Sequence, residues 1–133
     1  MKMRAVKSPK VADPRPQTWS NCKVCGNQVF ISGMIARDAA GKLPADASMY
    51  GQSMRIFEKI RDLVQAAGGR MDDIVKVTIF VTDIRQRDKV WRARREFFTG
   101  DFPASTLVQV AALADPALKV EIEAVAHIGA GAR

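Results

Sequence analysis

Residues 72–83 read Asp-Asp-Ile-Val-Lys-Val-Thr-Ile-Phe-Val-Thr-Asp, and the central stretch, Ile74 to Thr82, alternates two kinds of side chain. One set is wholly apolar and the other is mixed, which predicts a β-strand with one face in a hydrophobic core. The apolar set is Val75, Val77, Ile79 and Val81, and the mixed set is Lys76, Thr78, Phe80 and Thr82. The rest of the chain must supply a layer that covers the apolar face.

Two helices flank this strand in the sequence. The first is expected from about Asp46 to Ala67, and Gly68-Gly69 ends it. The second is expected from about Arg87 to Phe98, with Gly100 after it. Their apolar faces consist of Ile56, Phe57, Ile60, Leu63, Val64 and Ala67 in the first helix and of Val90, Ala93, Phe97 and Phe98 in the second. These faces provide the covering layer.

Three further strands complete the predicted sheet: Gln28 to Ser32, ending at Gly33, then Ser105 to Ala112 and Leu118 to His127. Residues 1–16 are rich in basic residues and proline, which suits an edge strand or a loop. The tail, residues 129–133, is expected to fray. The chain has no internal repeat, so we expect a single domain over residues 1–133.

The two faces of the last two strands differ in character. The even-numbered set suits the helix layer and consists of Val108, Val110, Leu118, Val120, Ile122 and Ala124. The odd-numbered set lies on the opposite face and consists of Ser105, Leu107, Gln109, Glu121 and Glu123. Two helices can cover only one face of the sheet, and the other face is too apolar for open water and too polar for a simple core. We therefore expect an oligomer whose sheets pack together, with polar pockets between subunits.

Composition limits the class of protein. The 133 residues are 47% hydrophobic and 26% charged, which excludes disordered and fibrous chains. No run of about 18 uncharged apolar residues is present, and the N-terminus lacks the apolar run of a secretory signal, which predicts a cytoplasmic protein without membrane contact. The net charge of +7 favours anionic partners, either nucleic acid or small molecules.

Cys22 and Cys25 form a CxxC motif within a stretch that looks extended. In a strand this spacing points the two thiols to opposite faces, so two reduced cysteines are favoured over a redox pair. The sole histidine, His127, is distant in sequence, and one cysteine pair cannot complete a four-ligand zinc site. We expect no metal site.

Glu121 and Glu123 carry the strongest local signal for chemistry. The two carboxylates lie on one side of a predicted strand, with Lys119 beside them. A carboxylate in a partly dry interface has a raised pKa and serves as a general acid or base. The alternative is a polar strand face paired with lysine across the sheet.

Residues 85–95 contain six basic side chains and one acid, Asp88, together with Trp91. The functional interpretation is a patch that binds phosphates or another anion, with the tryptophan as a stacking surface. The alternative is a solvated helix face. No helix-turn-helix or RNP-like motif accompanies the patch, so nucleic acid is a secondary hypothesis.

Four separated stretches resemble one family. They are residues 29–33 (Val-Phe-Ile-Ser-Gly), residues 66–69 with 72–83, residues 102–104 (Phe-Pro-Ala) and residues 119–124 (Lys-Val-Glu-Ile-Glu-Ala). In this order they resemble the RidA family of reactive-intermediate deaminases, also called the YjgF family. The resemblance implies a chorismate-mutase-like α+β fold, with a mixed sheet, two helices on one face, and a homotrimer with clefts at its subunit interfaces.

The resemblance also implies an activity. Deaminase members of the family hydrolyse imines and enamines such as 2-aminoacrylate to a 2-keto acid and ammonia, without metal or cofactor. Their catalytic glutamate falls on Glu121, and the glycine that lines the cleft falls on Gly33. The arginine that clamps the substrate carboxylate falls on Ser105, where a hydroxyl replaces the guanidinium.

Other cleft positions differ as well. Leu107 stands where deaminase members often have cysteine, Trp19 where they have tyrosine, and Trp91 where asparagine is common. Ser105, Thr106 and the Gly33 backbone are the expected hydrogen-bond partners of the substrate. Without the arginine, either another cation such as Arg94 or Arg15 reaches the cleft, or the substrate is aromatic or neutral and lies between the tryptophans.

These observations favour a divergent imine or enamine hydrolase of the RidA family in which Glu121 polarises a water molecule. Two alternatives remain: a trimer that binds a metabolite without converting it, and an RNA-binding protein or ribonuclease.

Overall fold

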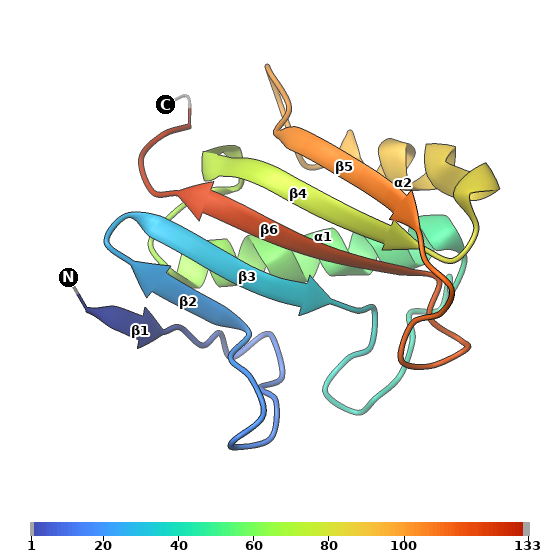
Figure 1. Cartoon of the computed structure of the whole chain (residues 1–133), viewed down its shortest axis with the longest axis horizontal. Coiled ribbons are helices and arrows are strands. Elements are labelled where there is room, and N and C mark those ends of the chain that lie inside the picture. Colours follow the sequence, from blue (N-terminus) through green and yellow to red (C-terminus); the bar gives the residue numbers. More distant parts are fainter. Residues whose placement is uncertain (1, 132–133) are drawn as a thin grey trace.

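The computed structural model describes residues 2–131, and over this range the chain forms a six-stranded mixed sheet with two α-helices on one face (Figure 1). The strands are β1 (Met3–Ala5), β2 (Cys22–Cys25), β3 (Gln28–Met34), β4 (Ile74–Val81), β5 (Ala104–Gln109) and β6 (Val120–His127). The helices are α1 (Met49–Ala66) and α2 (Arg87–Arg94), with short 3-10 turns at Met71–Asp73 and Ile84–Gln86. The predicted α+β class is confirmed.

The order of the strands across the sheet is β1-β2-β3-β6-β4-β5. Neighbouring strands are antiparallel except β4 and β5, which are parallel. A parallel pair needs a crossover connection, and α2 provides it. Both helices lie behind the sheet in Figure 1, so one sheet face is covered, here called the helix face, and the other is uncovered, here called the open face.

Helix α1 begins later than the sequence predicts because residues 46–48 form its cap. Asp46 Oδ1 accepts the Ser48 N–H over 3.1 Å, and Ser48 Oγ accepts the Gly51 N–H over 3.2 Å. A Cβ on Gly51 would collide with the backbone of Asp46, so this turn requires glycine. The helix ends at Ala66, and Gly68, two residues later, has a φ of 95° that suits glycine alone.

Helix α2 is shorter than predicted. Its regular turns end at Arg94, and the N–H groups of Glu96 and Phe97 bond to carbonyls three residues back, at Ala93 and Arg94. The two phenylalanines that follow still reach the core, where the rings of Phe97 and Phe98 lie 5.4 and 5.9 Å from that of Phe57. No helix among the described residues is long and apolar enough to cross a membrane.

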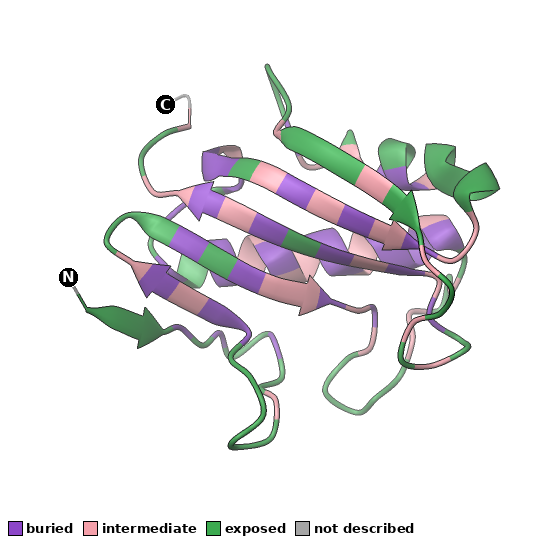
Figure 2. Ribbon diagram, in the orientation of Figure 1, coloured by how far each residue is buried: buried purple, intermediate pink, exposed green. Residues whose placement is uncertain are grey.

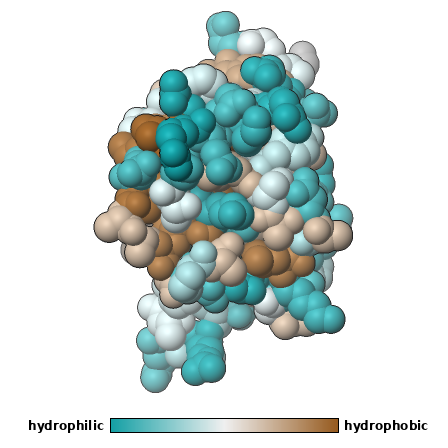
Figure 3. All heavy atoms as spheres, turned by 90° about the vertical axis from the view of Figure 1, so that its right-hand side faces the viewer, coloured by the Kyte–Doolittle hydropathy of each residue, from teal (hydrophilic) through white to brown (hydrophobic). Residues whose placement is uncertain are grey.

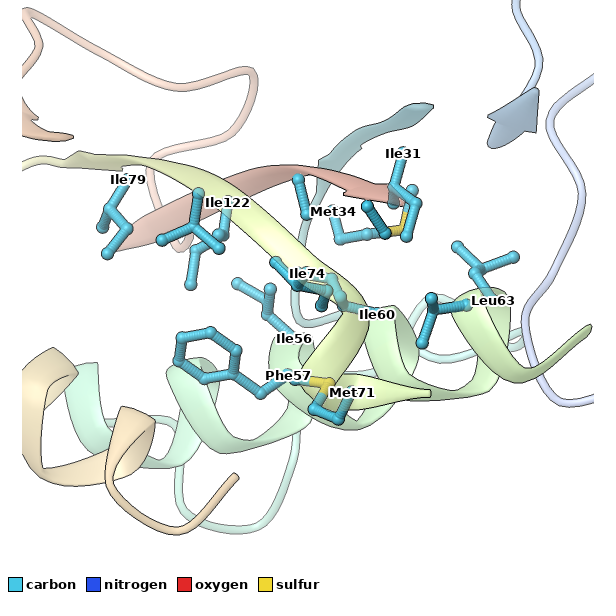
Figure 4. Packing of buried hydrophobic residues seen from close by; sticks show 14 of the residues in the cluster. Ile31, Met34, Ile56, Phe57, Ile60, Leu63, Met71, Ile74, Ile79 and Ile122 are labelled. Carbon is cyan, nitrogen blue, oxygen red and sulfur yellow. The ribbon is translucent and has the colours of Figure 1, made fainter. Parts of the chain in front are cut away.

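The core lies between the helices and the helix face of the sheet (Figure 4). Ile56, Phe57, Ile60 and Leu63 of α1 are completely buried there, as their helical spacing predicts. Burial alternates along β6, where even-numbered residues point into the core and odd-numbered residues point to the open face (Figure 2). This alternation agrees with the sequence prediction for β6 and fixes the direction of every odd-numbered side chain on that strand.

The prediction for β5 was wrong. Leu107 pairs with Ile79 of β4 and packs against the core, so the odd-numbered residues of β5 lie on the helix face. Val108, which we expected in the core, is 40% exposed on the open face. Strand β5 lies at the edge of the sheet, and only Leu107 of the strand is partly buried. Both of its faces carry apolar and polar residues, so the alternation of side chains alone could not show which face is covered.

The register also shifts at the start of β4. Between Ile74 and Lys76 the pairing with β6 is irregular, so Ile74 is buried and Val75 is 40% exposed instead of lying in the core.

At the other end of the chain, the Gly131 N–H donates to the buried Asp73 carboxylate over 2.8 Å. This bond holds part of the tail that was expected to fray, and residues 132–133 lie outside the described residues.

One buried polar side chain joins α1 to the start of β6. Gln52 is completely buried; its amide nitrogen donates to the carbonyls of Ala47 and Ala117, over 2.9 and 3.0 Å, and its oxygen accepts the Lys119 N–H over 3.0 Å. The amide thereby satisfies three backbone groups in a region closed to water. Sequence pattern gave no sign of this role.

Replacing this amide by an apolar side chain of similar size should therefore destabilise the fold. We expect Gln52→Met to lower the free energy of unfolding by about 3 kcal/mol, because buried backbone groups lose their partners. Urea denaturation measures the change, and Gln65→Met on the exposed side of the same helix is the matched control. Equal stability of the two variants would contradict this role of Gln52.

Candidate functional site

Glu121 lies on the open face of β6, opposite Phe80 of β4. Its carboxylate makes no hydrogen bond or ion pair within the described residues, so no lysine of the same chain pairs with it there. Partial burial is the main cause that raises the pKa of Glu121, and the like charge of Glu123 adds to it. A carboxyl with a raised pKa and no partner is suited to accept and return a proton.

Gly33 of β3 lies directly beneath this carboxylate. The pairing of β3 with β6 is irregular between Ile31 and Met34, which brings the backbone of Gly33 against the Glu121 side chain. A Cβ placed on Gly33 would lie 2.8 Å from Cδ of Glu121 and closer still to its Oε2. Only glycine leaves room for the carboxylate in this position, so the structure joins the two residues that the sequence analysis selected.

A cavity of about 200 Å³ opens beside Gly33, and Trp19 also lines it. Trp19 is 62% exposed and additionally borders a neighbouring cavity of about 430 Å³, which includes Arg15. Gly33 therefore lies against Glu121 and also shares a cavity with Trp19, and Glu121 itself is not among the residues that line this cavity.

Lys59 of α1 also lines the cavity beside Gly33, a contribution that the sequence analysis missed. Its ammonium donates to the carbonyls of Ile35 and Arg37, over 2.7 and 3.1 Å. Burial, and to a lesser extent Arg55, lower the pKa of Lys59. Its sequence spacing from Ile56 and Leu63 places this lysine on the apolar side of the helix, and this spacing could have identified it.

Ser105 lies on the helix face, not on the open face as predicted. It pairs with Val77 in β4, and its Oγ accepts a hydrogen bond from Nη1 of Arg94 over 3.0 Å. Burial, together with Arg95, lowers the pKa of Arg94. The structure therefore brings together Ser105 and the cation that the sequence analysis named as a substitute for the missing arginine.

The remaining predicted residues surround this second group. Leu107 lies on the helix face two residues along β5, and Trp91 of α2 is 37% exposed. Thr106 points to the open face, where its Oγ1 accepts a hydrogen bond from Lys76 over 2.6 Å. Thr106 therefore shares a face with Glu121, but β4 lies between their strands, so they are separated by about 10 Å across the sheet.

Within one chain the candidate residues thus form two groups. The glutamate group is Glu121, Gly33 and Trp19, and the serine group is Ser105, Arg94, Leu107 and Trp91. The glutamate lies on the open face of β6 and the serine on the helix face of β5, so one chain does not bring them to the same substrate. Seen from the right-hand side of Figure 1, the surface mixes hydrophobic and hydrophilic side chains (Figure 3).

Several basic residues of segment 85–95 have individual partners. Arg85 pairs with Asp83 over 2.9 Å, Arg92 lies 4.3 Å from the ring centre of Tyr50, and Arg87 lies 5.7 Å from that of Trp91. Such separate contacts favour defined local roles over one continuous track for phosphates.

Both cysteines are free thiols, with Cys22 buried and Cys25 partly exposed. Burial raises the pKa of the Cys22 thiol to about 11, which keeps it protonated and unreactive at neutral pH. The structure agrees with the expectation of two reduced cysteines on opposite faces of β2. Among the described residues, no group of three or more His, Cys, Asp or Glu side chains could hold a metal ion.

Residues 12–128 match the family model described as Endoribonuclease L-PSP. The 2-iminobutanoate/2-iminopropanoate deaminase of Escherichia coli K12 is 37% identical over 105 residues, which are 76% of this chain and 80% of that protein. RidA from an Antarctic Psychrobacter species is 29% identical, with a TM-score of 0.85 and coverage of 94% of this chain and 99% of its own. Escherichia coli TdcF with bound serine is 29% identical, with a TM-score of 0.84 and coverage of 93% and 98%.

The fold defines a class of small α+β proteins with two helices on one face of a mixed sheet. Within that class, the chain belongs to the Endoribonuclease L-PSP family, which is the RidA/YjgF family that its sequence motifs resemble. The family resemblance is thereby confirmed.

The raised pKa of Glu121 predicts how stability depends on pH. Between its ordinary pKa in the unfolded chain and its higher pKa in the folded one, the folded protein binds more protons, so this group lowers stability as pH rises. We expect Glu121→Gln to be more stable than the wild type at about pH 7 and no more stable at about pH 3, where the carboxyl is protonated in both states.

Urea denaturation at the two pH values measures this difference. Glu96→Gln, which changes an exposed glutamate in the turn after α2, is the control and should show no such dependence. A loss of stability in Glu121→Gln at neutral pH would contradict the assignment.

Proposed function

We propose that this protein is a divergent imine or enamine hydrolase that acts at clefts between the subunits of a homotrimer. The observation that carries the proposal is the unpartnered Glu121 carboxylate, which is partly buried and rests against Gly33. The deaminase name of a relative that is 37% identical gives the reaction class, and the serine bound to TdcF supports a small-molecule ligand.

The proposed reaction is the addition of water to a carbon–nitrogen double bond. The imine enters as its protonated iminium form; Glu121 takes a proton from water while the oxygen bonds to the imine carbon and the C=N π pair moves to nitrogen, which gives a neutral carbinolamine. The carboxyl then gives its proton to nitrogen, the C–N bond breaks and ammonia leaves, and the carbinol hydroxyl releases its proton to the Glu121 carboxylate, and from there to solvent, as the carbonyl forms. An enamine enters this scheme after protonation of its carbon. A raised carboxyl pKa suits both steps, because the same group acts first as base and then as acid.

The positions of the candidate residues support a site made from two copies of the chain. Glu121 and Ser105 cannot meet within one subunit, whereas apposed copies can bring the open face of one to the β5 edge of another. Apolar side chains on the open face favour such contact: Phe30 is 44% exposed and Val108 is 40% exposed. Burial of these side chains by another subunit is favourable at about 25 cal/mol per Å².

We further propose that Ser105 makes the site divergent. A hydroxyl binds a carboxylate with one hydrogen bond, whereas the arginine of the deaminase members provides a charged, two-pronged donor. Ser105, Thr106 and the Gly33 backbone supply neutral contacts for the substrate, and Leu107, Trp19 and Trp91 supply apolar surface.

The test is hydrolysis of freshly generated imino acids, followed as release of ammonia. We expect the wild type to exceed the uncatalysed rate and Glu121→Gln to lower kcat by about a hundredfold or more, because the general base is lost. Glu58→Gln on α1 is the matched control, since it removes a carboxylate from the opposite side of the sheet.

Other outcomes point to the alternative functions. A small molecule that is bound and never converted, with Glu121→Gln binding it equally well, would contradict the hydrolase and favour a metabolite-binding trimer. Cleavage of RNA that is lost on charge reversal at Arg94 and Arg95, with RNA affinity that falls steeply as salt is added, would favour a ribonuclease. Size-exclusion chromatography with light scattering checks the trimer, and a monomer would contradict the shared cleft.

A further inference from the structure

One flank of α2 carries a row of two arginines and one tryptophan. Arg87, Trp91 and Arg94 are spaced by four and three residues, which places them on one side of the helix, next to the buried line of Val90 and Ala93. Arg94 contacts β5, and the Arg87 guanidinium lies over the Trp91 ring. These three residues are called the α2 stripe below.

Arg94 retains unused hydrogen-bonding capacity. Among the described residues its guanidinium makes one hydrogen bond, to Ser105 Oγ, and its buried Nε has no partner. The Nη2 group also makes no hydrogen bond among the described residues and, unlike Nε, is not closed off by burial. No carboxylate of the described residues pairs with Arg94 to neutralise its charge.

We propose that the α2 stripe and Ser105 form an anion site in which Arg94 binds the carboxylate of a planar, aromatic acid and Trp91 stacks on its ring. The proposal rests on the hydrolase function above and names its substrate class: imines of aromatic 2-amino acids. Arg94 of α2 thus supplies the cation of the site, and the small side chain of Ser105 leaves room for the Arg94 guanidinium against β5.

The chemistry of the α2 stripe explains this preference. The Nη2 group of Arg94 has no partner among the described residues and can bind a carboxylate through a charge-assisted hydrogen bond, and an exposed indole beside it provides a flat apolar surface. The 37% exposure of Trp91 leaves part of the ring open to a ligand. A small aliphatic acid would use the cation and leave the indole without contact.

Binding of stable 2-keto acids tests the assignment without requiring turnover. Isothermal titration of the intact protein with phenylpyruvate and with pyruvate compares an aromatic with a small ligand. We expect phenylpyruvate to bind the wild type more tightly by about tenfold or more, and Trp91→Ala to remove that preference. Arg94→Gln should weaken both ligands by about tenfold or more, because a charge-assisted bond is lost.

Two further variants make the test specific. Arg95→Gln removes an exposed neighbouring charge and should leave both affinities unchanged. Ser105→Arg in the Arg94→Gln background should restore keto-acid binding, since it returns a guanidinium to the same place from the strand. Equal effects of Arg94→Gln and Arg95→Gln, or failure of the wild type to bind either keto acid, would overturn the proposal.

The outcome also separates this inference from the hydrolase function. Arg94-dependent binding without hydrolysis of any imine would refute the proposed reaction and leave the anion site standing. Hydrolysis that depends on Glu121 but not on Arg94 would refute the anion site and leave the reaction standing.

If two subunits share each site, co-assembly of Glu121→Gln and Arg94→Gln subunits should raise the activity above that of either variant alone, because random mixing leaves about a quarter of the sites with both residues intact. No recovery in mixed trimers would contradict a site to which one subunit contributes Glu121 and another contributes Arg94.

Discussion

Strand β6 lies between β3 and β4, and hydrogen bonds on both of its edges fix its register. A shift by one residue would turn Ile122 and Ala124 out of the core and Glu121 into it, which the apolar layer of α1 forbids. The position of the carboxylate is therefore a consequence of how the core packs. Gln52 reinforces that position, because it binds the backbone at Lys119, just before the strand begins.

Much of this arrangement could be predicted from sequence. The period-2 pattern around Val77 and Ile79 and the helical pattern of α1 identified the main layers, because both elements have one consistently buried face. The family motifs identified Glu121 and Gly33, which the structure brings into contact. Their contact depends on an irregular register in β3, and no local pattern encodes such an irregularity.

The sequence prediction failed where a strand is packed along one edge only, and where a contact joins residues that are far apart in the sequence. Strand β5 has a neighbour along one edge only, so its alternating pattern did not show which face is covered, and Ser105 was assigned to the wrong side. The contact between Arg94 and Ser105 joins residues on different elements, and no sequence spacing indicates it. Lys59 and Gln52 were missed because a polar side chain on a core-facing helix position is recognised only when its backbone partners are known.

In proteins of this architecture, the exposed strand β5 can accept more amino-acid substitutions than the strands inside the sheet. Apart from Leu107, each residue of that strand is exposed, so substitutions there cost little stability. Strand β6 has no such freedom, because each of its even-numbered residues fills space in the core. Substitutions can thus accumulate at the border of the sheet while the strand that carries Glu121 stays the same, and one scaffold can present chemically different borders without redesign of its interior.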